Sequence, residues 1–255
     1  MRLHNAINSP ARLSISAFAC LIAVGTLLLL LPAASTGDPL GLVDALFTST
    51  SAACVTGLTV VDTGTALTRF GQLVVLGLIQ AGGLGILTLS TVFLLVAGRR
   101  VSIAGRLTVR DTFTHTGERS VSRLLFDVVR FTFVIEALGA MLLFIRFFST
   151  RGPGEALYLA VFHAISAFCN AGFSPFSDSL TAFRNDWLVN FTVCGLIILG
   201  GIGFLVLAEV KSKRPLSRVG WARISLHSKL ALASALVLNV SGAVLLFAME
   251  YHNTL

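Results

Sequence analysis

Charged residues are scarce in this sequence, and the residue patterns that support catalysis are absent. Only 12% of the 255 residues are charged, whereas a soluble domain carries about 25%. The four cysteines form no CxxC pair and the five histidines no HExxH motif. No acid–base pair, nucleophile constellation or phosphate-cradling loop is visible, and the GGLG run at 82–85 lies inside an apolar span. The sequence therefore predicts neither catalytic residues nor a metal centre built from side chains.

Apolar residues are abundant instead, at 55% of the chain, with a mean hydropathy of +0.86. One soluble core cannot bury this much apolar sequence, so the lipid bilayer is its expected surroundings. The net charge of +7 is concentrated between apolar segments, whereas nucleic-acid binding needs a basic face with stacking aromatics. The basic clusters are Arg99, Arg100, Arg106, Arg110, Arg119 and Arg123, and Lys211, Lys213, Arg214, Arg218, Arg223 and Lys229. This placement is typical of cytoplasmic loops and predicts a multi-pass protein of a plasma or bacterial inner membrane.

Five apolar segments are long enough to cross the hydrocarbon core, at about 20 residues each. They cover residues 13–33, 71–97, 128–148, 187–209 and 230–250. The first could be a signal peptide, but its length favours a structural helix. Two shorter segments, 39–53 and 154–168, end in glycine-containing sequence and are predicted to be re-entrant half-helices. The expected fold is all-α, with helix–re-entrant pore loop–helix units, five spanning helices and two pore half-helices.

The basic residues also orient the chain and divide it. Arg2, Arg12 and both basic clusters place the N-terminus and two loops in the cytoplasm, so the half-helices enter from outside. The predicted parts are a first repeat at 1–100, a basic linker at 101–126, a second repeat at 127–210, a second linker at 211–229 and the first helix of a truncated third repeat at 230–255. The stretch from Arg99 to Arg123 is expected to be an interfacial helix that touches anionic lipid.

The two short segments superpose when the chain is shifted by 115 residues. The aligned pairs include Cys54 with Cys169, Gly57 with Gly172 and Arg69 with Arg184. Paired Cys, Gly and Arg at one offset are hard to obtain by chance, so the sequence indicates a duplicated unit. Both copies have their basic loop inside, which makes the duplication parallel and predicts units arranged around an axis normal to the membrane.

The loops that follow the short segments have the chemistry of a potassium filter. Such a filter replaces the hydration shell of the ion with backbone carbonyls, and glycine reaches the required left-handed backbone at little cost. The candidate donors are Val55, Thr56, Gly57, Leu58, Asn170, Ala171, Gly172 and Phe173. We therefore expect potassium to be bound by backbone oxygens, with the C-terminal ends of the half-helices favouring the cation. Ordinary loops with a turn glycine are the alternative.

Three motifs then indicate a family. CVTGLTVVDTG at 54–64, GLIQAGGLGI at 77–86 and CNAGFSPFSD at 169–178 resemble the Trk/Ktr/HKT potassium transporter superfamily, and most of all the Ktr-type membrane pore subunit. The resemblance implies potassium uptake through four such units around one pore, a homodimer of pore subunits and a cytoplasmic nucleotide-binding regulatory subunit. It also implies an alternative role for the stretch from Arg99 to Arg123, namely docking of that regulatory subunit. Potassium is the expected transported ion, with sodium as a second candidate and no covalently bound cofactor. Because neither loop contains TVGYG, we expect weaker discrimination against sodium than TVGYG channels show.

The chain departs from the family pattern because it holds two of the four repeats and one further helix. Two loops cannot close a four-sided filter, so two hypotheses stay open. Either several copies of the chain pool their loops as a homo-oligomer, or the chain is a non-conducting truncated fragment or a half-transporter that needs a second chain.

Four further sets of residues carry hypotheses of their own. The inner-helix glycines Gly82, Gly83, Gly85, Gly200, Gly201 and Gly203 are expected to allow close helix packing, with bending beside the pore as the alternative. For Glu136, inside a predicted span, a buried structural role is favoured over a role in conduction. Asp62 and Asp178 either concentrate cations at the pore mouth or cap loop turns. His163 is expected to pack on its half-helix rather than to bind a ligand.

Overall fold

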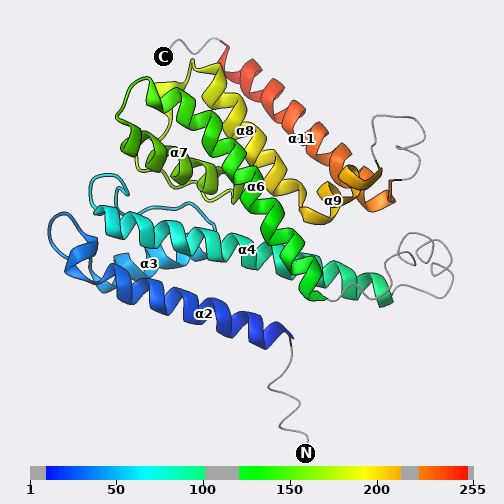
Figure 1. Cartoon of the computed structure of the whole chain (residues 1–255), viewed down its shortest axis with the longest axis horizontal. Helices are drawn as coiled ribbons and strands as arrows, with labels where there is room; N and C mark the ends of the chain where they lie inside the picture. Colours follow the sequence, from blue (N-terminus) through cyan, green and yellow to red (C-terminus); the bar gives the residue numbers. More distant parts are fainter. Residues whose placement is uncertain (1–9, 101–120, 214–223, 252–255) are drawn as a thin grey trace, which may run out of the picture. The chain divides into compact units, whose positions relative to one another are not determined.

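The computed structural model describes residues 10–100, 121–213 and 224–251, and these residues are almost entirely helical (Figure 1). Within them the only β-type pairing is an isolated bridge between Ser35 and Leu67. The chain forms two compact units, Met1–Ile197 and Ile198–Leu255, which are described separately. Most of the basic stretch from Arg99 to Arg123 lies outside the described residues, as does the centre of the second basic linker.

The helices follow the apolar pattern of the sequence closely. In chain order they are α2 (Pro10–Leu29), the short 3-10 helix η1 (Pro32–Ala34), α3 (Leu42–Ala53), α4 (Arg69–Arg100), α6 (Val121–Phe148), α7 (Pro153–Phe168), the short 3-10 helix η2 (Thr181–Phe183), α8 (Trp187–Ile202), α9 (Phe204–Lys213) and α11 (Leu226–Glu250). The two segments expected to be too short to span, 39–53 and 154–168, correspond to α3 and α7. Length and apolar composition therefore located the described helices of ten residues or more, except that α8 and α9 were predicted as one segment, 187–209.

Three of these helices are long and apolar enough to cross a membrane, namely α4 over Arg69–Ile86, α6 over Phe126–Phe148 and the whole of α11. The pair α8 and α9 adds a fourth if it is counted as one broken span, and α2 is a shorter apolar helix. The segment 187–209, expected as one span, is not straight, because the chain bends by 101° between Ile202 and Phe204. Gly203 lies at this break with φ +88, a conformation that L side chains rarely adopt.

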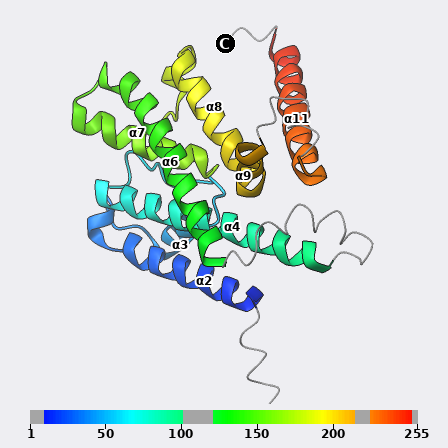
Figure 2. The same ribbon diagram turned by 45° about the vertical axis from the view of Figure 1, so that its right-hand side comes forward.

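In the first unit, α3 packs against α2 and α4, and α7 packs along α6 (Figure 1). Figure 2 shows the same neighbours from a second direction. The core that joins these helices includes Leu29 of α2, Ile79 of α4 and Phe162 of α7, each fully buried. Ala171 and Phe173, from the loop after α7, belong to the same core. The two short helices are therefore tied into one hydrophobic cluster, which holds the loops that follow them side by side.

In the second unit, the carboxylate of Glu209 on α9 holds the start of α11. It accepts hydrogen bonds from the backbone N–H of Ser225 at 2.9 Å and from the Ser225 hydroxyl at 2.6 Å. Ser225 is the N-cap of α11, and its hydroxyl also accepts from the N–H of Ser228 at 3.3 Å. The apolar side chains of α11, such as Leu236 and Phe247, are about two-thirds exposed within this chain, as expected of a lipid-facing or partner-facing span.

Candidate functional site

Both short helices end in the same backbone motif. After α3, the N–H of Thr56 donates to the carbonyl of Ser51 at 2.8 Å and the N–H of Val55 to the carbonyl of Ala52 at 3.2 Å. After α7, the N–H of Ala171 donates to Ser166 at 2.7 Å and that of Asn170 to Ala167 at 3.0 Å. This pair of bonds is the Schellman motif, which places the residue after the C-cap in the left-handed conformation. Each loop thus leaves its helix in the same direction.

The left-handed residues then alternate along both loops. Val55 and Gly57 have φ values of 55° and 80°, and Asn170 and Gly172 have values of 59° and 73°. The two pairs differ by 115 in sequence number, the offset of the repeat. A regular strand points successive carbonyls to opposite sides, so a segment that turns them to one side must depart from strand geometry at alternate residues. The glycines were predicted for this role, whereas left-handed Val55 and Asn170 were not, and a β-branched residue there is an outlier.

The two candidate filter glycines lie against each other. A Cβ atom placed on Gly57 would be 2.7 Å from the carbonyl oxygen of Ala171, and one placed on Gly172 would be 3.3 Å from the Cα atom of Gly57. These neighbours are backbone atoms, which cannot rotate away as a side chain would. The structure therefore brings the loops of the two repeats into backbone contact, with no room for a side chain at Gly57.

The rest of the eight candidate donors differ in their surroundings. Ala171 is fully buried and Phe173 is 2% exposed, whereas the side chain of Leu58 is 60% exposed. The carbonyl of Phe173 already accepts a hydrogen bond from the Ser166 hydroxyl at 2.6 Å. His163 is packed on its half-helix, as expected, with Nδ1 donating to the carbonyl of Leu159 at 2.7 Å and Nε2 accepting from the Ser174 hydroxyl at 3.0 Å.

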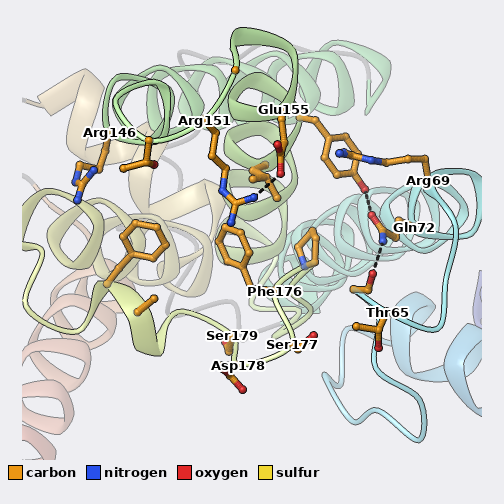
Figure 3. A pocket seen from close by; sticks show the side chains of 18 residues that line it. Thr65, Arg69, Gln72, Arg146, Arg151, Glu155, Phe176, Ser177, Asp178 and Ser179 are labelled. Atoms are coloured by element: carbon orange, nitrogen blue, oxygen red, sulfur yellow. Dashed lines mark hydrogen bonds and ion pairs between the residues drawn. The ribbon is translucent and has the colours of Figure 1, made fainter.

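Next to the segments that follow the two loops, a cavity of about 1020 Å³ lies between residues of the two repeats (Figure 3). In its wall the hydroxyl of Tyr158 on α7 donates to Gln72 Oε1 on α4 at 2.6 Å. Gln72 Nε2 donates in turn to the carbonyls of Thr63 at 3.0 Å and Leu67 at 3.1 Å. The guanidinium of Arg69 lies 4.0 Å from the centre of the Tyr158 ring. This network, which sequence reasoning missed, ties the segment after the first loop to the second repeat.

Of the two aspartates considered for the pore mouth, Asp62 makes capping contacts. Its Oδ1 accepts a hydrogen bond from the N–H of Gly64 at 2.7 Å, the geometry of an Asx turn. A hydrogen bond from the Ser177 hydroxyl, together with those from Gly64 and Thr65, holds the pKa of Asp62 below its ordinary value against the smaller effect of burial. Asp178 lines the cavity described above (Figure 3). The geometry thus favours loop capping at Asp62.

Glu136 lies behind the second loop, 4% exposed, between α4 and α7. Its Oε1 is 4.0 Å from Cys169 Sγ, and the side chain of Gln80 lies beside the carboxylate without the geometry of a full hydrogen bond. Its Oε2 has no protein partner within hydrogen-bond distance in the described part of the chain. No cluster of three or more His, Cys, Asp and Glu side chains is present among the described residues, so Glu136 is not part of such a metal site.

Replacement of Glu136 by glutamine is expected to leave both assembly and transport intact. Glutamine keeps the volume and the polar contact with Gln80 while removing a charge that is costly to bury. Glu136→Leu is the contrasting variant and is expected to lower the yield of monodisperse protein in detergent. A Glu136→Gln protein that assembles normally but has lost rubidium uptake would instead assign the carboxylate to conduction.

The inner-helix glycines play different roles in the two repeats. In the continuous helix α4, a Cβ on Gly82 would overlap the carbonyl oxygen of Ala53, and one on Gly83 would lie 2.5 Å from Cys169 Sγ. A Cβ on Gly85 would lie 3.3 Å from the ring of Phe18. Gly200 and Gly201 lie in the last turn of α8, just before the break at Gly203. Close packing therefore describes the first set, and bending describes Gly203.

One ion pair of the second repeat was not expected from the sequence. Arg146 at the end of α6 pairs with Asp186, whose Oδ1 also accepts from the N–H groups of Leu188 at 3.1 Å and Val189 at 3.2 Å at the start of α8. Burial acts to raise the pKa of Asp186, but the hydrogen bond from Arg146, its charge and the two N–H groups prevail, and the pKa lies below its ordinary value.

This lowered pKa predicts an acid dependence of stability. The stabilisation from ionised Asp186 is present above the unfolded-state pKa, about 3.9, and is lost as pH falls through the lower folded-state pKa. In thermal unfolding in detergent, the Tm of Asp186→Asn is expected to lie below that of the wild type at pH 6–8. The difference should narrow below about pH 4, and Arg146→Gln should behave alike. A difference in Tm that persists unchanged at pH 3 would show that the stabilisation does not come from the ionised carboxylate of Asp186.

Apolar helices of spanning length, interrupted by two short helices with matched loops, define a multi-pass membrane protein. The chain belongs to the TrkH family of cation transport proteins, whose pattern matches residues 9–252. It is 41% identical over 244 residues to the Ktr system potassium uptake protein B of Bacillus subtilis and 39% identical over 242 residues to that of Vibrio alginolyticus. It is 35% identical over 243 residues to the potassium/sodium uptake protein NtpJ of Enterococcus hirae.

These three alignments cover 95–96% of this chain and 52–53% of each relative. The chain thus spans about half the length of the curated relatives it matches.

Proposed function

We propose that this chain forms part of the ion-conducting subunit of a Ktr-type transporter and takes up potassium across a cell membrane. The observation that carries the proposal is the matched left-handed backbone at Val55 and Gly57 and at Asn170 and Gly172, in two loops that touch. Ions would shed water against carbonyls of residues 55–58 and 170–173. Among these donors, Phe173 contributes least, since its carbonyl already accepts a hydrogen bond from Ser166.

The membrane arrangement that fits this function has five spans and two re-entrant half-helices. In it α2, α4, α6, the bent pair α8–α9 and α11 cross the bilayer, and α3 and α7 enter from the outside with the N-terminus in the cytoplasm. The short lengths of α3 and α7, at 12 and 16 residues, support this arrangement. The basic linkers would then face the cytoplasm, where a nucleotide-binding regulatory subunit would dock.

The names of the relatives support potassium as the transported ion, with sodium as the second candidate. Two loops do not enclose a four-sided filter, so conduction requires either pooled loops from several copies or a second chain. The test is rubidium uptake into potassium-uptake-deficient cells that express the 255-residue chain alone. Uptake, with sodium competing more strongly than in TVGYG channels, supports pooled loops. No uptake with the protein present in the membrane overturns conduction by this chain alone.

A second candidate function follows from the coverage of about half of each relative. In this reading the chain is a half-transporter that conducts only after it assembles with a separate C-terminal chain. Co-expression with a C-terminal half of a Ktr-type relative, followed by affinity purification through a tag on this chain, distinguishes the two. Restored uptake and co-purification favour the half-transporter, whereas a polydisperse chain that binds nothing favours a non-conducting fragment.

A further inference from the structure

Two side chains of α7, the helix that precedes the second loop, form hydrogen bonds with that loop. The Ser166 hydroxyl donates to the carbonyl of Phe173 at 2.6 Å, one residue beyond Gly172. The neutral ring of His163 accepts from the Ser174 hydroxyl at 3.0 Å, and the Ser174 oxygen accepts from the N–H of Phe176 at 3.0 Å. Two of these contacts tie the loop to α7, at Phe173 and Ser174, and the third, within the loop, extends the chain of hydrogen bonds to Phe176.

These contacts are enclosed rather than solvated. His163 is 3% and Ser166 is 4% exposed. The rings of Phe176 and Phe147 lie 4.9 Å and 5.8 Å from the His163 ring, measured between centroids. Because water cannot readily replace a buried hydrogen bond, loss of either donor or acceptor leaves its partner unpaired, which costs more than the net gain of forming the bond.

The first loop has corresponding positions without the corresponding contacts. Ser51 aligns with Ser166 and Thr48 with His163 at the offset of 115 residues. Both are buried, at 4% and 2% exposed, but neither hydroxyl has a protein partner within the part of the chain that the structure describes. The loops differ beyond the glycine, since Phe173 is buried in the core whereas the side chain of Leu58, its counterpart, is 60% exposed.

We propose that Ser166 and His163 are positioning residues that set the conformation of the second loop, while Ser51 and Thr48 do not set that of the first. The Phe173 carbonyl belongs to the peptide between Phe173 and Ser174, so fixing it anchors the chain directly after the Gly172–Phe173 peptide. This anchor restricts the directions that the Gly172 carbonyl can take. The second loop is then the more rigid of the two loops that line the ion pathway, and it is the main determinant of ion selectivity. The selectivity part of this inference rests on the proposed function; the positioning part does not.

The experiment compares two identical substitutions, Ser166→Ala and Ser51→Ala. In detergent, Ser166→Ala is expected to lower Tm by about 2–4 °C, the effect of one lost hydrogen bond in a chain of this size. Ser51→Ala is expected to leave Tm unchanged or raise it, because it removes a buried hydroxyl that has no protein partner. Ser166→Thr, which keeps the hydroxyl, should restore the wild-type value.

A second measurement tests the conformation of the loop through the labelling rate of Cys169, the residue that directly precedes it. With Cys20, Cys54 and Cys194 replaced by serine, maleimide modification of Cys169 is expected to be about fivefold faster in Ser166→Ala and His163→Leu than in the parent. Ser166→Thr and Thr48→Val should react at the parental rate. A simple loss of packing would not be rescued by the conservative hydroxyl.

Sodium competition is measured in cells that take up rubidium. In Ser166→Ala, the sodium concentration that reduces rubidium uptake to half is expected to be lower than in the wild type by a factor of about three or more. In Ser51→Ala, this concentration is expected to be unchanged. Equal effects of the two substitutions on Tm and competition, or an unchanged Cys169 rate in Ser166→Ala, would overturn the inference. If the wild-type chain takes up no rubidium, the proposed conduction by this chain fails. The labelling rates and Tm values then still decide whether Ser166 and His163 position the loop.

Discussion

Rubidium uptake is expected to fall about tenfold or more when Gly57 is replaced by alanine, while the protein remains in the membrane. Two physical effects combine at this position. The backbone has φ +80, where an L side chain is strained, and the added Cβ would lie 2.7 Å from the Ala171 carbonyl oxygen. The loops of both repeats would have to move apart, and the candidate carbonyls would lose their geometry. Uptake of labelled rubidium, normalised to the amount of protein in the membrane, measures the effect.

The matched control is Gly37→Ala, since Gly37 precedes the same half-helix and a Cβ there would meet no atom within 4 Å. It should transport as the wild type does. Gly172→Ala is expected to be harmful as well, because φ is +73, although its nearest neighbour is farther away at 3.3 Å. Wild-type uptake in Gly57→Ala would show that the first loop does not line the ion pathway. It would support the alternative that Gly57 is an ordinary turn glycine.

The second large effect is expected at Gly82, where alanine should destabilise the helix packing of the first repeat. A Cβ on Gly82 would overlap the carbonyl oxygen of Ala53 and lie 2.7 Å from its carbonyl carbon. These backbone atoms end the half-helix α3, so α3 and α4 must separate. Overpacking of this kind costs about 2 kcal/mol, which corresponds to a Tm drop of about 4–8 °C in a chain of this size. Thermal unfolding in detergent, with the monodisperse fraction, tests it.

Gly77 on the same helix supplies the control. A Cβ on Gly77 would meet nothing within 4 Å, and alanine is the better helix former by about 1 kcal/mol, so Gly77→Ala should be neutral or stabilising. A Gly82→Ala protein with wild-type Tm would show that α3 and α4 do not approach as closely as described. Gly83→Leu extends the test to the contact with Cys169, where a larger side chain has even less room.

Much of the architecture could be predicted because the lengths of apolar segments and the repeat are visible in one dimension. The segments 39–53 and 154–168 became α3 and α7, and the offset of 115 residues reappears in the φ values of Gly57 and Gly172. A re-entrant placement, the orientation and the ion ligands stay predictions. The segment 187–209, predicted as one span, is broken in the structure by a bend of 101° at Gly203, whereas the glycines of α4 pack in a continuous helix.

The conformational preferences of single residues could not predict the left-handed backbone at Val55. A β-branched residue disfavours this conformation, and it is held there by the two hydrogen bonds that close the end of α3. Nor could they pair Arg146 with Asp186, which are 40 residues apart, or Tyr158 with Gln72, which are 86 apart. Such contacts depend on how the helices meet.

By itself, the sequence determined that this is an all-helical membrane protein with a duplicated unit and one glycine per loop, because hydropathy, length and internal repetition are properties of the chain alone. Only the tertiary structure decided whether residues at equivalent positions of the two repeats make the same contacts. Ser51 and Ser166 occupy the same position in the two repeats, yet among the residues that the structure describes, Ser166 has a hydrogen-bond partner and Ser51 has none. The reason is that a hydrogen bond requires a partner at about 3 Å, and the fold around each copy, rather than the repeated sequence, places that partner.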